Sequence, residues 1–114
     1  MELNINGKNY ELSFGIKFIR EMDKIHEQDL KGIKMGIGLE MMEAQLSMGR
    51  PTALFDVIKC ATSHLKSKPS NDDIEVFLEE KAINGELENL FEEVGEATKQ
   101  APFLKQALEQ NQDK

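Results

Sequence analysis

The stretch SNDDIEVFLEEKAINGELENLFEEV, residues 70–94, decides the fold, because it predicts two consecutive amphipathic helices. Ser70 offers the side-chain oxygen that an N-cap needs, and the acids after it suit the positive end of a helix. Apolar residues recur at helical spacing in both halves, and Gly85 separates the two helices. The residues expected inside are Ile74, Phe77 and Leu78 in the first helix, and Leu87, Leu90, Phe91 and Val94 in the second.

Helical spacing also extends to both sides of this stretch, while the glycines at 32, 36 and 38 indicate a loop or a weakly started helix. The first predicted helix has a stripe of Phe14, Phe18, Met22 and Ile25. The first of these helices is predicted over 14–28 with Ser13 as N-cap, and the second over 39–48, ending at Gly49. The third is predicted over 50–67, with Pro51 in its first turn. A short last helix is expected to begin at Pro102 and to contain the apolar residues Phe103, Leu104, Ala107 and Leu108.

The N-terminal segment 2–12 differs, because its apolar residues alternate around Asn6-Gly7. Asn-Gly supplies the two positive-φ positions of a type I′ turn, so the segment predicts a β-hairpin. The expected fold is therefore mainly α, of the α+β class: an N-terminal hairpin followed by about five helices in a small bundle. We expect one domain over 1–108, with its helical part at 14–108, and a frayed polar tail at 109–114.

The charge is unevenly distributed. The 114 residues carry 14 basic and 21 acidic side chains, a net charge of −7, and segment 71–101 alone holds ten acids and two bases. An acidic protein repels nucleic acid, so no nucleic-acid partner is expected. The helices of this segment are expected to carry an acidic face, which could also meet a basic partner, formed by Glu75, Glu79, Glu80, Glu88, Glu92, Glu93 and Glu96.

The predicted helix 39–48 is apolar on two sides. One side carries Met35, Leu39, Met42 and Leu46, and the opposite side carries Ile37, Met41, Ala44 and Met48. Two interpretations follow: the helix is the central element of the monomer, or its second side meets another chain. Methionine side chains adapt to varied apolar partners, so the second side is the candidate protein interface.

Catalytic and metal-binding motifs are weak. Asp56, Cys60 and His64 form a ladder of four-residue steps, which the sequence favours as a semi-exposed polar edge with an incidental thiol rather than a metal site. His26 lies near the end of the first long helix, where a cation suits the dipole. We expect no enzyme activity, no cofactor and no metal. A single cysteine and the absence of a long apolar run favour the cytoplasm, without a membrane partner.

Three segments together carry a family resemblance: NINGKNYELSFG (4–15), SNDDIEVFLEE (70–80) and LFEEV (90–94). In order and spacing the chain resembles the tail assembly chaperones of long-tailed bacteriophages and prophages of Gram-positive bacteria. The resemblance implies a non-enzymatic protein that forms homo-oligomers and binds the tape measure protein before the tail tube assembles around it. It also implies action in the bacterial host cytoplasm, absence from the mature virion, and the tail tube protein as a further candidate partner.

Two other classes stay open at this point. An acidic protein-binding inhibitor, or a nucleic-acid mimic, would act through the helices of 71–101 and would bind in a strongly salt-dependent way. A metal-dependent enzyme would use Asp56, Cys60 and His64.

Overall fold

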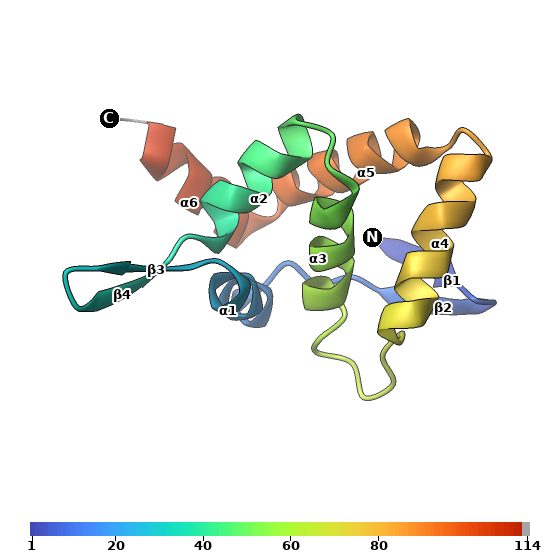
Figure 1. Ribbon diagram of the computed structural model, residues 1–114, viewed down its shortest axis with the longest axis horizontal. Helices are drawn as coiled ribbons and strands as arrows, with labels where there is room; N and C mark the ends of the chain where they lie inside the picture. Colours follow the sequence, from blue (N-terminus) through green and yellow to red (C-terminus); the bar gives the residue numbers. More distant parts are fainter. Residues whose placement is uncertain (113–114) are drawn as a thin grey trace.

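The computed structural model describes the backbone of residues 1–112 and the side chains of residues 1–108. Within these residues the chain forms six helices and two antiparallel β-hairpins, which confirms the predicted mainly α, α+β class (Figure 1). The elements are β1 (Glu2–Ile5), β2 (Lys8–Glu11), α1 (Ile16–Ile25), β3 (Glu27–Leu30), β4 (Ile33–Gly36), α2 (Gly38–Ser47), α3 (Pro51–Ala61), α4 (Asn71–Ile83), α5 (Leu87–Gln100) and α6 (Pro102–Gln112). The predicted frayed tail stays a prediction, and its residues 113–114 lie outside the described part.

The predicted N-terminal hairpin is confirmed. Strands β1 and β2 pair antiparallel, and Asn6 and Gly7 both adopt positive φ, 52° and 78°, as a type I′ turn requires. The apolar residues of the hairpin, Leu3, Ile5, Tyr10 and Leu12, are buried against the helices. Packing of this face supplies the stability that a lone two-stranded sheet lacks in water.

Helix α4 begins where the sequence predicts. The Ser70 hydroxyl accepts a hydrogen bond from the Asp73 backbone N–H at 3.0 Å, and the Asp73 carboxylate accepts one from the Ser70 N–H at 3.4 Å. This reciprocal capping box satisfies two donors that a helix start would otherwise leave free. The three residues expected inside α4 are buried. In α5, Leu90 and Val94 are buried, and Leu87 and Phe91 are half-buried.

Helix α1 is shorter than the predicted 14–28, and the predicted N-cap is wrong. Gly15 occupies the N-cap position without a side-chain bond, whereas the backbone N–H of Ser13 donates to the carbonyl of Ala61 at 2.9 Å. His26 is the C-cap, as expected for a histidine near the helix end, and its backbone leaves the helical region. Ile25, expected on the buried stripe, is 44% exposed.

A second hairpin replaces the loop predicted around the glycines at 32–38. Strands β3 and β4 pair antiparallel across a turn in which Lys31 and Gly32 have φ of 54° and 83°. The Asp29 carboxylate accepts the Gly32 N–H at 3.0 Å and stabilises this turn. The prediction missed it because Lys-Gly is not one of the recognised turn pairs. Met35 therefore lies on β4 and not on the buried side of the following helix.

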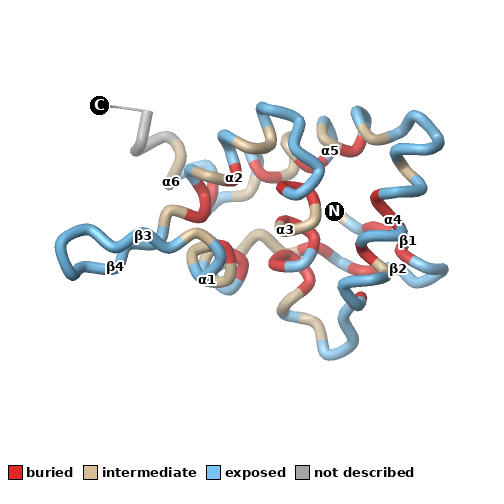
Figure 2. Tube along the Cα trace, in the orientation of Figure 1, coloured by how far each residue is buried: buried red, intermediate tan, exposed pale blue. Residues whose placement is uncertain are grey.

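Helix α3 is the centre of the core and packs against α1, α2 and α4 (Figure 1). In Figure 2 the buried parts of the chain gather around α3. The residues of α3 that are buried in the core are Ala53, Leu54, Val57, Ile58, Cys60 and Ala61. It ends at Ala61 and not near the predicted Ser67. The hydroxyl of Thr62 donates to the carbonyl of Ile58 at 2.8 Å, and such local bonds compete with helix continuation.

Candidate interaction surfaces

The predicted interface on α2 divides into two halves. Ile37 and Met41 are half-buried, whereas Ala44 and Met48 are exposed, Met48 by 67%. On the other side of the helix, Leu39 and Met42 are buried and Leu46 is half-buried. The outer face of α2, defined by Ile37, Met41, Ala44 and Met48, is thus open to a partner at its C-terminal half. Its use as an interface stays a prediction.

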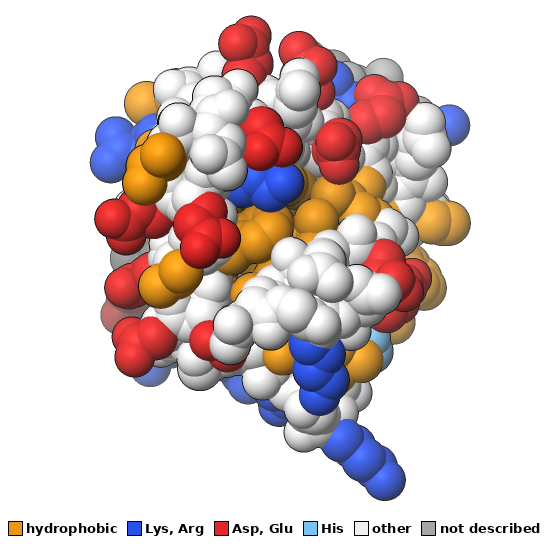
Figure 3. All heavy atoms as spheres, turned by 90° about the vertical axis from the view of Figure 1, so that its right-hand side faces the viewer, with side chains coloured by type: hydrophobic (Ala, Val, Ile, Leu, Met, Phe, Trp, Pro, Cys, Tyr) orange, Lys and Arg blue, Asp and Glu red, His pale blue; other side chains and the backbone are white. Residues whose placement is uncertain are grey.

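The seven glutamates of the predicted acidic face are all exposed. They are distributed over two helices that run in different directions (Figure 1). Figure 3 looks at the α4 end of the molecule and shows acidic side chains around an apolar area, with basic side chains beside that area and at the lower edge. Within the described residues none of the seven forms an ion pair, so their charges face water. Exposed charge of one sign favours solubility and steers association.

The ladder of Asp56, Cys60 and His64 does not form. Helix α3 ends at Ala61, so exposed His64 leaves the helix, and Cys60 is buried rather than semi-exposed. Burial raises the pKa of Asp56 above its ordinary value. The nearby charge of His26, at the end of α1, lowers this pKa, but its effect is smaller than that of burial. No group of three or more possible metal ligands occurs among the described residues.

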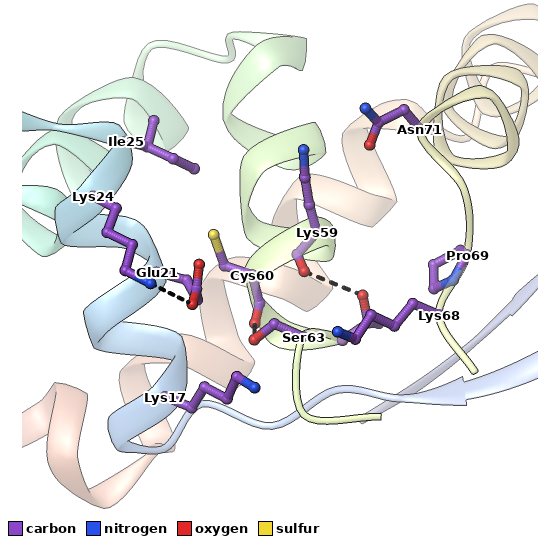
Figure 4. Close-up of a pocket in the computed structure, with 11 residues that line it drawn as sticks. Lys17, Glu21, Lys24, Ile25, Lys59, Cys60, Ser63, Lys68, Pro69 and Asn71 are labelled. Carbon is purple, nitrogen blue, oxygen red and sulfur yellow. Dashed lines mark hydrogen bonds and ion pairs between the residues drawn. The ribbon is translucent and has the colours of Figure 1, made fainter. Parts of the chain in front are cut away.

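Cys60 borders a pocket of about 390 Å³ between α1, α3 and the segment after α3 (Figure 4). Four lysines line this pocket, and one of them, Lys24, pairs with Glu21 at 3.1 Å. The thiol supplies no reactive group there, because burial first, then the carboxylates of Asp56 and Glu21, raise the pKa of Cys60 from its ordinary 9.0 to about 12. A protonated thiol is neither a nucleophile nor a metal ligand.

Labelling with a disulfide reagent at pH 8 tests the state of Cys60. The shift from 9.0 to about 12 leaves roughly a thousandfold less thiolate in the folded protein than in the unfolded chain. We expect slow labelling in buffer and rapid, stoichiometric labelling in guanidinium chloride. Equally rapid labelling of the folded protein would show that the thiol is not protected.

The raised pKa of Cys60 also affects stability at high pH. Above pH 9 the unfolded chain loses the thiol proton before the folded protein does, so raising the pH from 9 towards 12 should lower the free energy of unfolding.

A groove between α2, α5 and α6 was not predicted. It has a volume of about 820 Å³, and its floor is apolar: buried Met42, with half-buried Leu46, Phe91 and Leu108. Charged side chains form its rim, acidic at Glu43, Glu92 and Glu96 and basic at Lys99 and Lys105. The sequence places the apolar residues on three separate helices, and no signal in it indicates that the helices meet.

A projecting hairpin was also not predicted. All eight residues of β3 and β4 are exposed, and the hairpin extends away from the body of the molecule (Figure 2). Leu30, Ile33 and Met35 are among the exposed large hydrophobic residues. The alternation of apolar and charged residues in 27–36 is the signal that could have found it.

A family model described as "Phage tail assembly chaperone protein, TAC" matches residues 2–112. No curated protein and no solved structure matches the chain. No helix among the described residues is long and apolar enough to cross a lipid bilayer. The family match thus spans both hairpins and all the helices described above.

Proposed function

The chain belongs to the phage tail assembly chaperone family, and from this premise we propose that it binds the tape measure protein, keeps it soluble and promotes assembly of the tail tube. The family is non-enzymatic and its partners are phage tail proteins. The proposed setting is the cytoplasm of the bacterial host during tail assembly, and the protein is proposed to be absent from the mature virion.

The client-binding surface we propose is the outer face of α2. The family match is the observation that carries the function, and the exposed C-terminal half of this face supports the location. Tape measure proteins are expected to be long and helical with apolar stripes. Such a stripe can lie against an apolar helix face whose methionines adapt to varied side chains.

The acidic helices supply the second part of the proposed mechanism. A long apolar client associates with itself unless its apolar surface is covered and the complex carries charge. The net charge of −7 and the seven exposed glutamates on α4 and α5 supply that charge. The tail tube protein is proposed as a further partner, and self-association as a property of the free chaperone.

Coexpression with the tape measure protein of the same phage tests the client surface. We expect the chain to keep the client in the soluble fraction and to copurify with it. The double variant Ala44→Glu/Met48→Glu places two charges on the exposed half of the face, where folding tolerates them. It should leave most of the client insoluble, because a desolvated carboxylate opposes apolar contact.

Ile83→Glu is the matched control, because Ile83 is 77% exposed but lies on α4, away from α2. It should preserve client solubility, and circular dichroism should show native helix content in both variants. Normal client binding by the Ala44→Glu/Met48→Glu variant would exclude the outer face of α2. Failure of the wild-type chain to bind would contradict the proposed function itself.

A further inference from the structure

The pocket between α1, α3 and the segment after α3 is a basic site in an acidic protein. Its lining contains Lys17, Lys24, Lys59 and Lys68 but only one acid, Glu21. The pocket thus holds four of the chain's 14 basic side chains and one of its 21 acidic ones. A cleft lined by charge of one sign concentrates counter-ions, so this pocket attracts anionic groups although the whole chain carries −7.

Most of the positive charge in this pocket is not neutralised within the molecule. Glu21 pairs with Lys24 at 3.1 Å, which accounts for the one acid of the lining. Among the residues that the structure describes, the other three lysines of the pocket form no ion pair. The charge of Lys59 is shared with the carboxylate of Asp56 on the same helix. The other two lysines are therefore the cations that a ligand can use.

Lys17 and Lys68 approach the pocket from two different parts of the chain. Lys17 lies on α1, and Lys68 lies in the segment between α3 and α4. Figure 4 shows their amino groups extending from opposite sides towards Ser63. The Ser63 hydroxyl already donates to the Cys60 carbonyl at 2.6 Å, so an anion is recognised there by the two amino groups. Lysine binds as a flexible point charge without the fixed fork of arginine, which suits carboxylates in varied orientations.

Apolar surface lies beside these lysines. Ile25, Cys60 and Pro69 also line the pocket; the last two are buried, and Ile25 is 44% exposed. An apolar side chain of a ligand removes this surface from water while a neighbouring carboxylate meets a lysine. A bare inorganic anion has no apolar part and gains nothing from Ile25. The lining therefore favours an acidic peptide that also carries an apolar residue.

The size of the pocket and the charge around it restrict the ligand to a short segment. The volume of about 390 Å³ is near the lower end of the range for ligand pockets, roughly 300–1,000 Å³. Such a volume holds only a few side chains. Outside the pocket the net charge is more negative than the −7 of the whole chain. A long polyanion such as nucleic acid is therefore repelled beyond the pocket.

We propose that this lysine pocket binds a short acidic segment of a protein partner, with carboxylates on Lys17 and Lys68 and an apolar side chain against Ile25. The inference goes beyond the proposed function, because no lining residue of the pocket belongs to the outer face of α2. The pocket is a second contact site of different chemistry. It recognises charge, whereas the outer face of α2 offers apolar packing.

An NMR titration of the isotope-labelled chain tests the site. The probe is a pentapeptide with four glutamates around a central leucine. We expect saturable shifts of the backbone amides of α1 and of residues 59–71, and raised salt should weaken binding. The same peptide with glutamines in place of the glutamates should not bind. Shifts only outside the pocket, or equal binding by the glutamine peptide, would overturn the proposal.

Charge reversal identifies the two lysines. Lys17→Glu/Lys68→Glu should weaken peptide binding about tenfold or more, since each attractive contact becomes a repulsive one. Both side chains are exposed, so the fold tolerates the change. Lys99→Glu/Lys105→Glu is the matched control: it changes the net charge equally at exposed positions on α5 and α6. Equal losses in the two variants would mean that the peptide responds to net charge alone, which contradicts the proposed site.

Truncation of Ile25 separates a peptide site from a site for small anions. Ile25→Ala should weaken peptide binding severalfold and leave the binding of inorganic phosphate unchanged. Ile16→Ala is the control, because Ile16 is also on α1 and 51% exposed but does not line the pocket. Phosphate that binds more tightly than the peptide, or an Ile25→Ala variant that binds the peptide normally, would overturn the assignment to a peptide.

Two further measurements identify the partner and keep this inference apart from the proposed function. Sedimentation velocity of the wild-type chain and of Lys17→Glu/Lys68→Glu should give the same oligomeric state. Self-association that only the variant loses would assign the pocket to a second copy and contradict a separate partner. A chain that binds the peptide but leaves the tape measure protein insoluble would retain the pocket and exclude the chaperone function. A chain that solubilises the client but ignores the peptide would do the reverse.

Discussion

Replacing Gly38 by alanine is expected to destabilise the protein by about 3 kcal/mol or more, the upper range for forcing atoms into a packed site. A Cβ at this position would lie 2.4 Å from the carbonyl carbon of Met22 and 2.6 Å from the Asp23 nitrogen. These are backbone atoms of α1, so no side chain can rotate away to make room. Gly38 must also stay close to α1 because its N–H donates to the Asp23 carboxylate.

The same substitution in α5 is the control. Gly95 lies within the helix and an added Cβ would meet nothing within 4 Å, so Gly95→Ala should stabilise the protein by about 0.5–1 kcal/mol. Urea unfolding followed by circular dichroism measures both changes. Opposite signs for the two variants are the expected result. A Gly38→Ala variant as stable as the wild type would show that α1 and the start of α2 do not pack this closely.

Truncating Phe18 to alanine is expected to cost about 3–5 kcal/mol, the usual range for a fully buried aromatic residue. Phe18 is 1% exposed, and its ring packs edge to face on Phe14 with the centroids 5.1 Å apart. Removing the ring leaves a cavity between α1 and its neighbours and also removes that aromatic contact. In a protein of this size, such a loss consumes a large part of the total stability.

Phe103→Ala is the matched control for Phe18→Ala. Phe103 is 53% exposed at the start of α6, so its truncation should change stability by less than about 1 kcal/mol. Unfolding midpoints in urea, with equal slopes for the variants, provide the comparison. Equal losses for the two phenylalanines would mean that Phe18 does not belong to the core.

The two hairpins show why one strand pair was predicted and the turn of the other was missed. Asn6-Gly7 provides a local signal, since both residues accept positive φ at little cost. Lys31 also adopts positive φ, but lysine gives no sign of this in a sequence. The Asp29 carboxylate on the Gly32 N–H and the packing of Gly36 on Asp23 hold that turn and its base in place. Such contacts exist only once the chain has folded.

The candidate surfaces also divide into features that the sequence predicted and features that it did not. The two-sided apolar pattern of residues 37–48 was visible as helical periodicity, and the structure leaves Ala44 and Met48 exposed. The ladder from Asp56 to His64 was wrong because the helix was assumed to continue past Ala61. The groove was invisible, because Leu46, Phe91 and Leu108 come from three helices and meet only in the packed molecule.

The sequence by itself determined the helix-rich class, the first hairpin, the Ser70 cap and the concentration of acidic charge on α4 and α5. These depend on residues close together along the chain, where spacing, turn chemistry and capping act directly. Only the tertiary structure decided where α1 and α3 end, that the hairpin of residues 27–36 projects from the body of the molecule, and that three helices enclose a groove. These features depend on contacts between residues that are far apart in the sequence. The packing free energy of such contacts cannot be inferred from a local sequence pattern.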